Sequence, residues 1–189
     1  VDGQCPLALG HPNGALAQGR RYLDKQPKGT AAGHALVGEA HAARGNLGEA
    51  RKELETAVAL EPGRRRWPVR LAYVLRRAGK PADALATLDK LGPPSAPGID
   101  PDWYLEVGEA LLAQGDAKAA VGRLAAVVPE LPGDAEIRTV LGAAQLAAGQ
   151  GEAAIKSLDE AEAIRSTPRS KKLLATALTT VAAAQLSAN

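Results

Sequence analysis

The sequence predicts an all-α solenoid built from repeated helical hairpins, and two observations support this prediction. In the stretch from Asp102 to Gly115, small or apolar residues recur at helical spacing, at Leu105, Gly108, Leu111 and Leu112. The glycine that ends this stretch has counterparts at steps of 34, 36 and 34 residues, namely Gly45, Gly79, Gly115 and Gly149. Each glycine is followed by a second stretch with helical spacing, and two helices joined by a short turn form a hairpin. A fixed period of this length is typical of repeat proteins.

Three further markers keep the phase of the turn glycines. A small residue lies seven positions before each glycine, an alanine five positions after it, and a leucine four positions beyond the alanine. These markers are Gly38, Ala72, Gly108 and Gly142; Ala50, Ala84, Ala120 and Ala154; and Leu54, Leu88, Leu124 and Leu158. The small residues would let the backbones of paired helices approach closely. Because one hairpin cannot bury its apolar face alone, stacked hairpins are expected to build the core.

The elements follow in chain order. Residues 1–13 contain two prolines and two glycines and predict an extended lead-in, followed by an unpaired helix over 14–26. Helix pairs are predicted at about 30–44 and 47–60, 66–78 and 81–91, 101–114 and 117–129, and 134–148 and 151–164.

Two proline-containing segments separate these helices. The segment 92–98 holds three prolines, which exclude helix, and predicts a joint that accounts for the 36-residue step. Asp100 and Pro101 then predict an N-cap with proline at the first helical position. Pro168 begins a last helix over about 168–186, expected to cap the end of the solenoid. The alternative is a helix that binds a partner or lies on a membrane surface.

With these markers in place, the chain resembles the tetratricopeptide repeat family, whose unit has 34 residues. The copies are 31–64, 65–98, 101–134 and 135–168, and the family's Leu-Gly pair is matched by Val37-Gly38, Leu71-Ala72, Val107-Gly108 and Leu141-Gly142. The chain departs from the family's pattern at the aromatic place of the second helix, which holds leucine in all four copies. It also departs at the tryptophan place, which is filled by His34, Pro68, Tyr104 and Arg138. The resemblance implies a right-handed superhelix of antiparallel helix pairs over residues 1–189, with a half-repeat within 1–30 and a capping helix over 169–189.

Composition limits the classes of partner and the compartment. The formal net charge of +2 gives no strong attraction to nucleic acid or to a membrane surface. No apolar run reaches the roughly 18 residues of a membrane-spanning helix. The single cysteine cannot form an intramolecular disulfide, so the compartment stays open between cytoplasm and periplasm. The sequence contains no methionine, which indicates a missing native start: a signal or lipid-anchor segment was removed, or the sequence is a fragment.

The sequence contains no catalytic constellation, and we expect neither an enzyme nor a cofactor. His34 and His41 are seven residues apart, whereas a zinc pair on a helix needs a spacing of four, so they are expected to fill the core or its edge. Cys5 has no second cysteine at metal or haem spacing and is expected to be an inert thiol.

Charges are segregated along the chain. Between Arg64 and Lys80 there are seven basic residues and no acid, and between Leu91 and Ala117 there are five acids and no Lys or Arg. In the family, the first helix of each repeat lines a concave groove. The resemblance implies that the groove-facing places hold, in the second repeat, Arg66, Val69, Arg70, Tyr73, Arg76 and Arg77. In the third repeat they hold Asp102, Leu105, Glu106, Glu109, Leu112 and Ala113.

Two interpretations of this segregation compete. Either the two charged patches satisfy each other and the remaining charges form a solvated face, or the groove orients a bound peptide that has an acidic and a basic end. In the second case the partner-binding residues are Arg66, Arg70, Tyr73, Arg76, Arg77, Asp102, Leu105, Glu106 and Glu109, with Tyr73 and Leu105 as apolar anchors.

The family resemblance also bears on the partner and the role. Members that hold chaperone C-termini use a clamp of Lys and Asn, and Glu39 at one matching place would repel a terminal carboxylate. That role is therefore not expected here. The resemblance more generally implies a non-catalytic adaptor or assembly factor that binds a protein or peptide segment in the groove. Bacterial relatives often serve in envelope, pilus or secretion assembly. The alternative function is a permanent structural subunit of a larger complex.

Overall fold

The structure is a computed structural model that describes residues 12–25, 30–94 and 100–187. Across these residues it contains α-helices, one short 3₁₀ helix and no strand, which confirms the predicted fold class. The contacts divide the chain into two compact units, Val1–Gly92 and Pro93–Asn189. Cys5, the lead-in up to residue 11 and residues 95–98 of the predicted joint lie outside the described residues.

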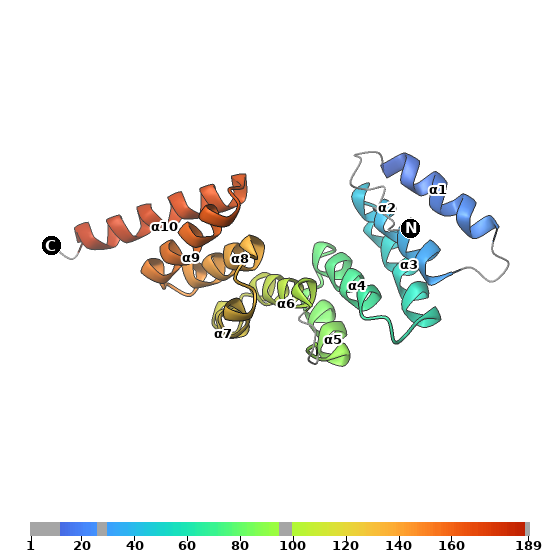
Figure 1. Cartoon of the computed structure of the whole chain (residues 1–189), viewed down its shortest axis with the longest axis horizontal. Helices are drawn as coiled ribbons and strands as arrows, with labels where there is room; N and C mark the ends of the chain where they lie inside the picture. Colours follow the sequence, from blue (N-terminus) through green and yellow to red (C-terminus); the bar gives the residue numbers. More distant parts are fainter. Residues whose placement is uncertain (1–11, 26–29, 95–99, 188–189) are drawn as a thin grey trace. The chain divides into compact units, whose positions relative to one another are not determined.

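The described part of the first unit contains five helices that pack on one another in chain order (Figure 1). They are α1 (Pro12–Asp24), α2 (Ala31–Ala43), α3 (Leu47–Leu60), α4 (Arg66–Arg77) and α5 (Pro81–Leu91). Helix α1 lies against α2, where Leu16 and Leu23 pack with Val37 and Ala40. It begins at Pro12, within the segment predicted as lead-in, because proline is tolerated in the first turn of a helix.

The second unit repeats this arrangement. It contains α6 (Pro101–Gln114), α7 (Ala117–Val127), the 3₁₀ helix η2 (Val128–Glu130), α8 (Ala135–Ala147), α9 (Gly151–Ile164) and α10 (Pro168–Ser187). Helix α7 ends two residues earlier than predicted because Pro129 has no N–H to continue the ladder. Within the described residues, no helix is long and apolar enough to cross a membrane.

The turn glycines have one shared conformation. Gly45, Gly79, Gly115 and Gly149 all have φ between 74° and 89°, in the left-handed region that glycine adopts without steric cost. After each glycine, the next backbone N–H donates to the carbonyl oxygen five residues earlier, as Asp116 does to Leu111 at 2.9 Å. This pattern is a Schellman motif, so the repeated glycine ends each first helix and turns the chain into the second.

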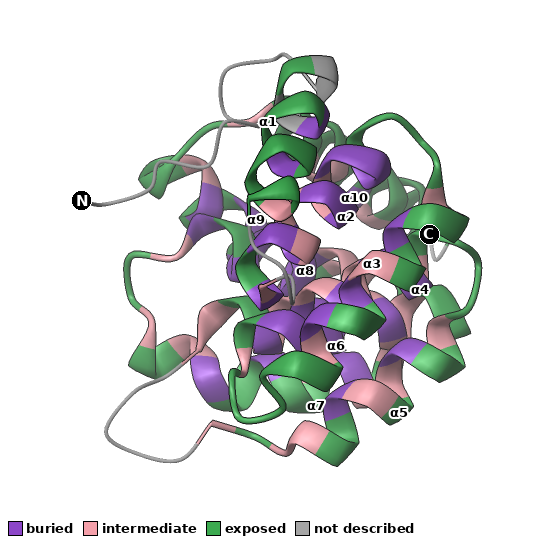
Figure 2. Ribbon diagram, turned by 90° about the vertical axis from the view of Figure 1, so that its right-hand side faces the viewer, coloured by how far each residue is buried: buried purple, intermediate pink, exposed green. Residues whose placement is uncertain are grey.

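The small residue seven positions before each turn glycine lies where the two helices of a hairpin touch. A Cβ atom added to Gly38 would lie 2.9 Å from Leu54 Cγ and 3.1 Å from the carbonyl oxygen of Ala50. The leucine marker of every repeat is fully buried, at Leu54, Leu88, Leu124 and Leu158. Figure 2 shows buried and exposed residues on most helices, whereas α8 is largely buried and α10 is largely exposed. The predicted close approach of paired helices is therefore confirmed.

Side-chain caps fix where several helices begin. Thr30 Oγ1 accepts a hydrogen bond from Gly33 N at 3.1 Å, and Asp116 and Asp134 cap α7 and α8 in the same way. Asp100 accepts from Trp103 N at 3.3 Å, with Pro101 at the first helical position, as the sequence predicts.

Candidate functional site

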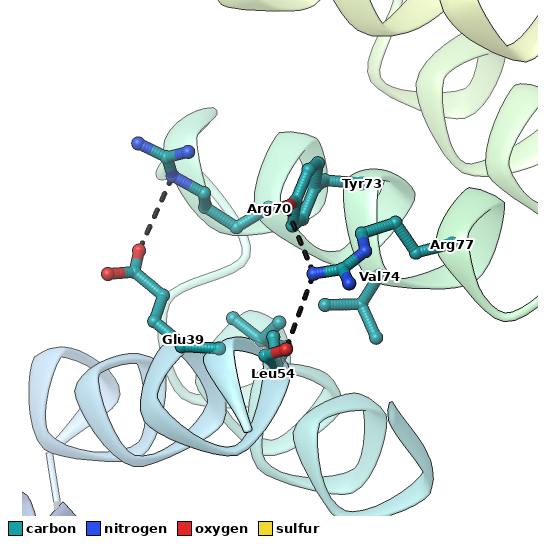
Figure 3. Close-up of a pocket in the computed structure, with 8 residues that line it drawn as sticks. Glu39, Leu54, Arg70, Tyr73, Val74 and Arg77 are labelled. Atoms are coloured by element: carbon teal, nitrogen blue, oxygen red, sulfur yellow. Dashed lines mark hydrogen bonds and ion pairs between the residues drawn. The ribbon is translucent and has the colours of Figure 1, made fainter. Parts of the chain in front are cut away.

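The candidate site is a pocket of about 310 Å³ in the first unit, where α2 faces α4 (Figure 3). Helix α2 contributes three lining residues spaced three and four apart, and α4 contributes four with the same spacing. Leu54 of α3 completes the lining. The full set is Glu39, Ala42, Ala43, Leu54, Arg70, Tyr73, Val74 and Arg77.

The apolar residues of α4 bury one face of the helix, and its charged residues lie at the edge of that face. Val69, Leu71, Val74 and Leu75 are buried and anchor the helix in the unit. Arg70, Tyr73 and Arg77 lie at the edge of that buried surface, where long side chains can cover apolar groups and keep their polar ends in water. The floor of the pocket is therefore apolar, and its rim is charged.

One end of the pocket is an ion-pair cluster. Glu39 Oε1 lies 3.3 Å from Arg70 Nε and 3.9 Å from Arg66 Nη2. The Glu39 side chain is 13% exposed, whereas those of Arg66 and Arg70 are 51% and 39% exposed. Two arginines of the predicted basic surface are thus paired with an acid of the preceding hairpin, inside the first unit.

Arg77 occupies the other end of the pocket. Its Nη1 donates to the carbonyl oxygen of Ala42 at 3.3 Å and to the Tyr73 hydroxyl at 3.2 Å (Figure 3). The guanidinium carbons of Arg76 and Arg77 both lie 5.6 Å from the centre of the Tyr73 ring, within cation–π range. Tyr73 is therefore within cation–π range of two arginines and is half-buried.

The acidic residues of the predicted groove belong to the second unit and have varied surroundings. Asp102 is exposed, Leu105 packs against the core cluster of Leu124, Val127 and Ile137, and Glu106 is buried. Glu109 lies 2.6 Å from Nη1 of Arg169, the second residue of α10. The part of this surface open to a partner is smaller than the sequence alone indicates.

The two helical histidines have structural surroundings, one in contact with a carboxylate and the other buried. His34 Nδ1 lies 2.7 Å from Glu53 Oε2, and His41 is buried. Within residues 12–25, 30–94 and 100–187, no group of three or more His, Cys, Asp or Glu side chains could hold a metal ion.

The sequence predicts five partner-binding residues that all lie on α4, but it does not predict their contacts. These residues are Arg66, Arg70, Tyr73, Arg76 and Arg77. From the sequence, Glu39 was predicted only to repel a terminal carboxylate, whereas in the structure it pairs with Arg66 and Arg70. The available signal was its place in the repeat, since α2 and α4 are the first helices of successive repeats and contact each other. Arg169 gave no comparable signal, because its partner Glu109 lies two hairpins earlier in the chain.

A family model matches most of the chain. Its description is "Tetratricopeptide repeat", and it matches residues 41–105 and 111–177. A search of curated proteins finds no match.

Solved structures share the fold. A chain of the APC/C hetero-tetramer Cut9-Hcn1 gives a TM-score of 0.78 at 17% identity over 91% of this chain and 34% of the other. PilW, described as a widely conserved type IV pilus biogenesis factor, gives 0.78 at 20% identity over 100% and 94%. YrrB, described as having an unusual peptide-binding site, gives 0.66 at 21% identity over 92% and 87%. This chain thus spans about a third of the Cut9-Hcn1 chain and nearly all of PilW.

Proposed function

Because this chain belongs to the tetratricopeptide repeat family, whose fold serves as a protein–protein interaction module, we propose that it binds a segment of a partner protein between α2 and α4. The family is generally non-catalytic, and the proposal contains no chemical step. The chain would act as an adaptor or assembly factor.

The observation that carries the proposal is the pocket between α2 and α4. Its volume of about 310 Å³ lies at the lower end of the range for binding pockets, which begins at roughly 300 Å³. An apolar floor under a rim of arginines offers burial for one side chain and attraction for an acidic segment. Rim charges of this kind raise the association rate and set the orientation of the ligand.

The basic surface of α4 gives the partner its expected charge. Arg66, Arg70, Arg76 and Arg77 outnumber Glu39, which among the described residues is the one acid that lines the pocket. YrrB, of the same fold, is described as having a peptide-binding site, which supports a peptide-type ligand here. We propose the acidic residues Asp102, Glu106 and Glu109 of α6, together with the apolar Leu105, as a further partner-binding surface, of which Asp102 is the most exposed member.

A permanent structural subunit is the second candidate, and exposed leucines on α10 favour it. Leu178 is 50% exposed and Leu186 is 80% exposed, in the half of the helix with little cover. A subunit of this kind would self-associate or aggregate when purified alone, whereas a groove receptor would be a soluble monomer. Sedimentation analysis of the full chain separates the two.

The binding proposal is tested by peptide selection with a blocked pocket. The full chain would be screened against random peptides with acetylated N-termini and amidated C-termini. Enriched peptides would then be measured against Ala43→Trp, in which an exposed lining residue of α2 is enlarged into the pocket. The control is Ala175→Trp, the same change at an exposed position of α10.

We expect the enriched peptides to bind the wild type and Ala175→Trp equally and to lose at least about tenfold in affinity with Ala43→Trp. Helical content and melting temperature would confirm that both variants fold. Failure to enrich any peptide, or equal binding by Ala43→Trp, would overturn the proposal.

A further inference from the structure

The arginines of α4 divide into two groups with different partners. Arg66 and Arg70 share the carboxylate of Glu39, at 3.9 and 3.3 Å. Arg77 lies two turns further along the same face, and its hydrogen bonds go to the Ala42 carbonyl and the Tyr73 hydroxyl, which are both neutral. Within the described residues, no carboxylate forms an ion pair with Arg77, and its side chain is exposed.

This division limits where a ligand anion can bind. A carboxylate that approaches Arg70 also approaches Glu39, and two like charges at that distance repel each other. Residues 70 and 77 are seven apart, which corresponds to about 10.5 Å along a helix axis. The Arg70 side chain extends toward Glu39 and away from Arg77 (Figure 3), so in this arrangement one carboxylate does not contact both arginines, and the Arg77 end is the favourable position.

The apolar floor lies beside that position. Ala42, Leu54 and Val74 line the pocket next to Arg77, and Leu54 and Val74 are almost fully buried (Figure 3). An apolar side chain placed there would bury its surface without leaving a polar group unpaired.

We propose that this pocket recognises an apolar side chain with one acidic side chain next to it, in an internal segment of the partner. The apolar group lies over Leu54 and Val74, and the carboxylate binds Arg77. Glu39 is the specificity-determining residue, since its carboxylate already pairs with Arg66 and Arg70 and repels a second acid at their end. The inference rests on the proposed function and deepens it by naming the class of ligand.

The structure favours an internal acid over a chain-terminal carboxylate. Glu39 lines the same pocket as the apolar floor. A terminal carboxylate is attached directly to the residue whose side chain fills the pocket, so it would stay within the pocket that Glu39 lines and be repelled by it. An Asp or Glu side chain on the neighbouring residue carries its carboxylate outward, toward the exposed Arg77.

The test uses four end-blocked versions of one enriched peptide and one unblocked version. The blocked versions are the parent, one with the acid changed to its amide, one with the apolar residue changed to Ala, and one with a second acid on the opposite side of the apolar residue. The fifth version lacks the acid and ends in a free carboxylate after the apolar residue. Each is measured by calorimetry with the wild type, Arg77→Gln, Glu39→Gln and the control Arg44→Gln, an exposed arginine at the end of α2.

For the wild type and Arg44→Gln, we expect affinity to fall at least about tenfold when the acid becomes an amide, because charge-assisted hydrogen bonds are the strong ones. With Arg77→Gln, the acid and amide peptides should bind equally. With Glu39→Gln, the two-acid peptide should gain about tenfold relative to the wild type. Circular dichroism establishes that each variant is folded.

The outcomes separate the two levels of the proposal. If no peptide binds the wild type, the proposed function itself fails. If peptides bind but Arg77→Gln still discriminates acid from amide, or Glu39→Gln leaves the two-acid peptide unchanged, the ligand assignment fails while peptide binding stands. If the free-carboxylate peptide binds better than the parent, the pocket recognises a chain terminus, which overturns the internal-acid assignment.

Discussion

Gly142 of α8 and Leu158 of α9 are in such close contact that a Cβ atom added to the glycine would lie 2.5 Å from Leu158 Cγ. Leu158 is fully buried, so its branch carbon has no space into which to move. Gly38 with Leu54 and Gly108 with Leu124 repeat this contact. The distance between the two helices of these hairpins is therefore set by the absence of a single methyl group.

Gly142→Ala is expected to destabilise the protein. Overpacking a core costs about 1–3 kcal/mol, and the higher helix propensity of alanine returns at most about 1 kcal/mol. Gly122→Ala on α7 is the control, since a Cβ at Gly122 would meet nothing within 4 Å. Denaturant unfolding should show a loss for the first variant and a gain of up to about 1 kcal/mol for the second. Equal gains would contradict the close contact.

The ion pair between Arg169 and Glu109 should contribute more to stability than the pair between Arg165 and Glu136. The first pair has an N–O distance of 2.6 Å, with Glu109 15% exposed, and links α10 to α6. The second has a distance of 3.6 Å between side chains that are 63% and 54% exposed. Exposed pairs contribute roughly 0–1 kcal/mol.

Two double-mutant cycles to alanine measure these coupling energies by thermal unfolding. We expect a clear coupling for Arg169 with Glu109 and a value near zero for Arg165 with Glu136. A coupling of equal size in both cycles would show that burial and geometry do not distinguish the pairs.

The carboxylate of Glu162 should make the attachment of α10 depend on pH. It accepts hydrogen bonds from the hydroxyls of Ser170 and Ser166 and from Thr167 N, and these bonds hold the pKa of Glu162 below its usual value. A depressed pKa means that the stabilising contribution is present above the pKa of the unfolded chain, about 4.3. It is lost as the pH falls through the lower folded value.

Glu162→Gln should therefore lower the melting temperature at pH 7, and the difference from wild type should shrink as the pH falls below about 4. Asp159→Asn, an exposed acid on the same helix, serves as the control and should show no such trend. A difference that stays constant from pH 7 to pH 3 would exclude the carboxylate as its cause.

Arg65 should limit local opening at the end of α5. Its guanidinium donates to the carbonyl oxygens of Leu91 at 3.3 Å and Gly92 at 2.7 Å, which joins the start of α4 to the end of the hairpin. Arg65→Ala removes both donors, so the amide of Gly92, which bonds to Leu88 and Asp89, should exchange with solvent several-fold faster.

Arg64→Ala is the matched control for this exchange measurement, since Arg64 lies over the Trp67 ring and near Glu61 and not at α5. Its Gly92 exchange should equal that of the wild type. Faster exchange in both variants would point to a general loss of stability.

The sequence alone predicted the fold class, every helix pair to within about two residues, the turns and the close contacts inside hairpins. These features depend on local chemistry. A left-handed turn needs Gly115, a capped start needs Asp100, and a tight crossing needs Gly108 opposite Leu124. Each is encoded by residue types at fixed spacing within one repeat. The turn glycine recurs in all four repeats, and the capped start and the glycine–leucine contact each recur in three.

The pairing of charges was decided only by the tertiary structure. The sequence separates a basic stretch from an acidic one, but it does not state that Arg66 and Arg70 contact Glu39, that Arg77 does not, or that Arg169 reaches Glu109. Long charged side chains have many rotamers of similar energy, and their partners depend on which helix faces meet after packing. The periodic apolar pattern fixes those faces only approximately. The charged and apolar groups that line the pocket are therefore determined only when α2 and α4 pack together.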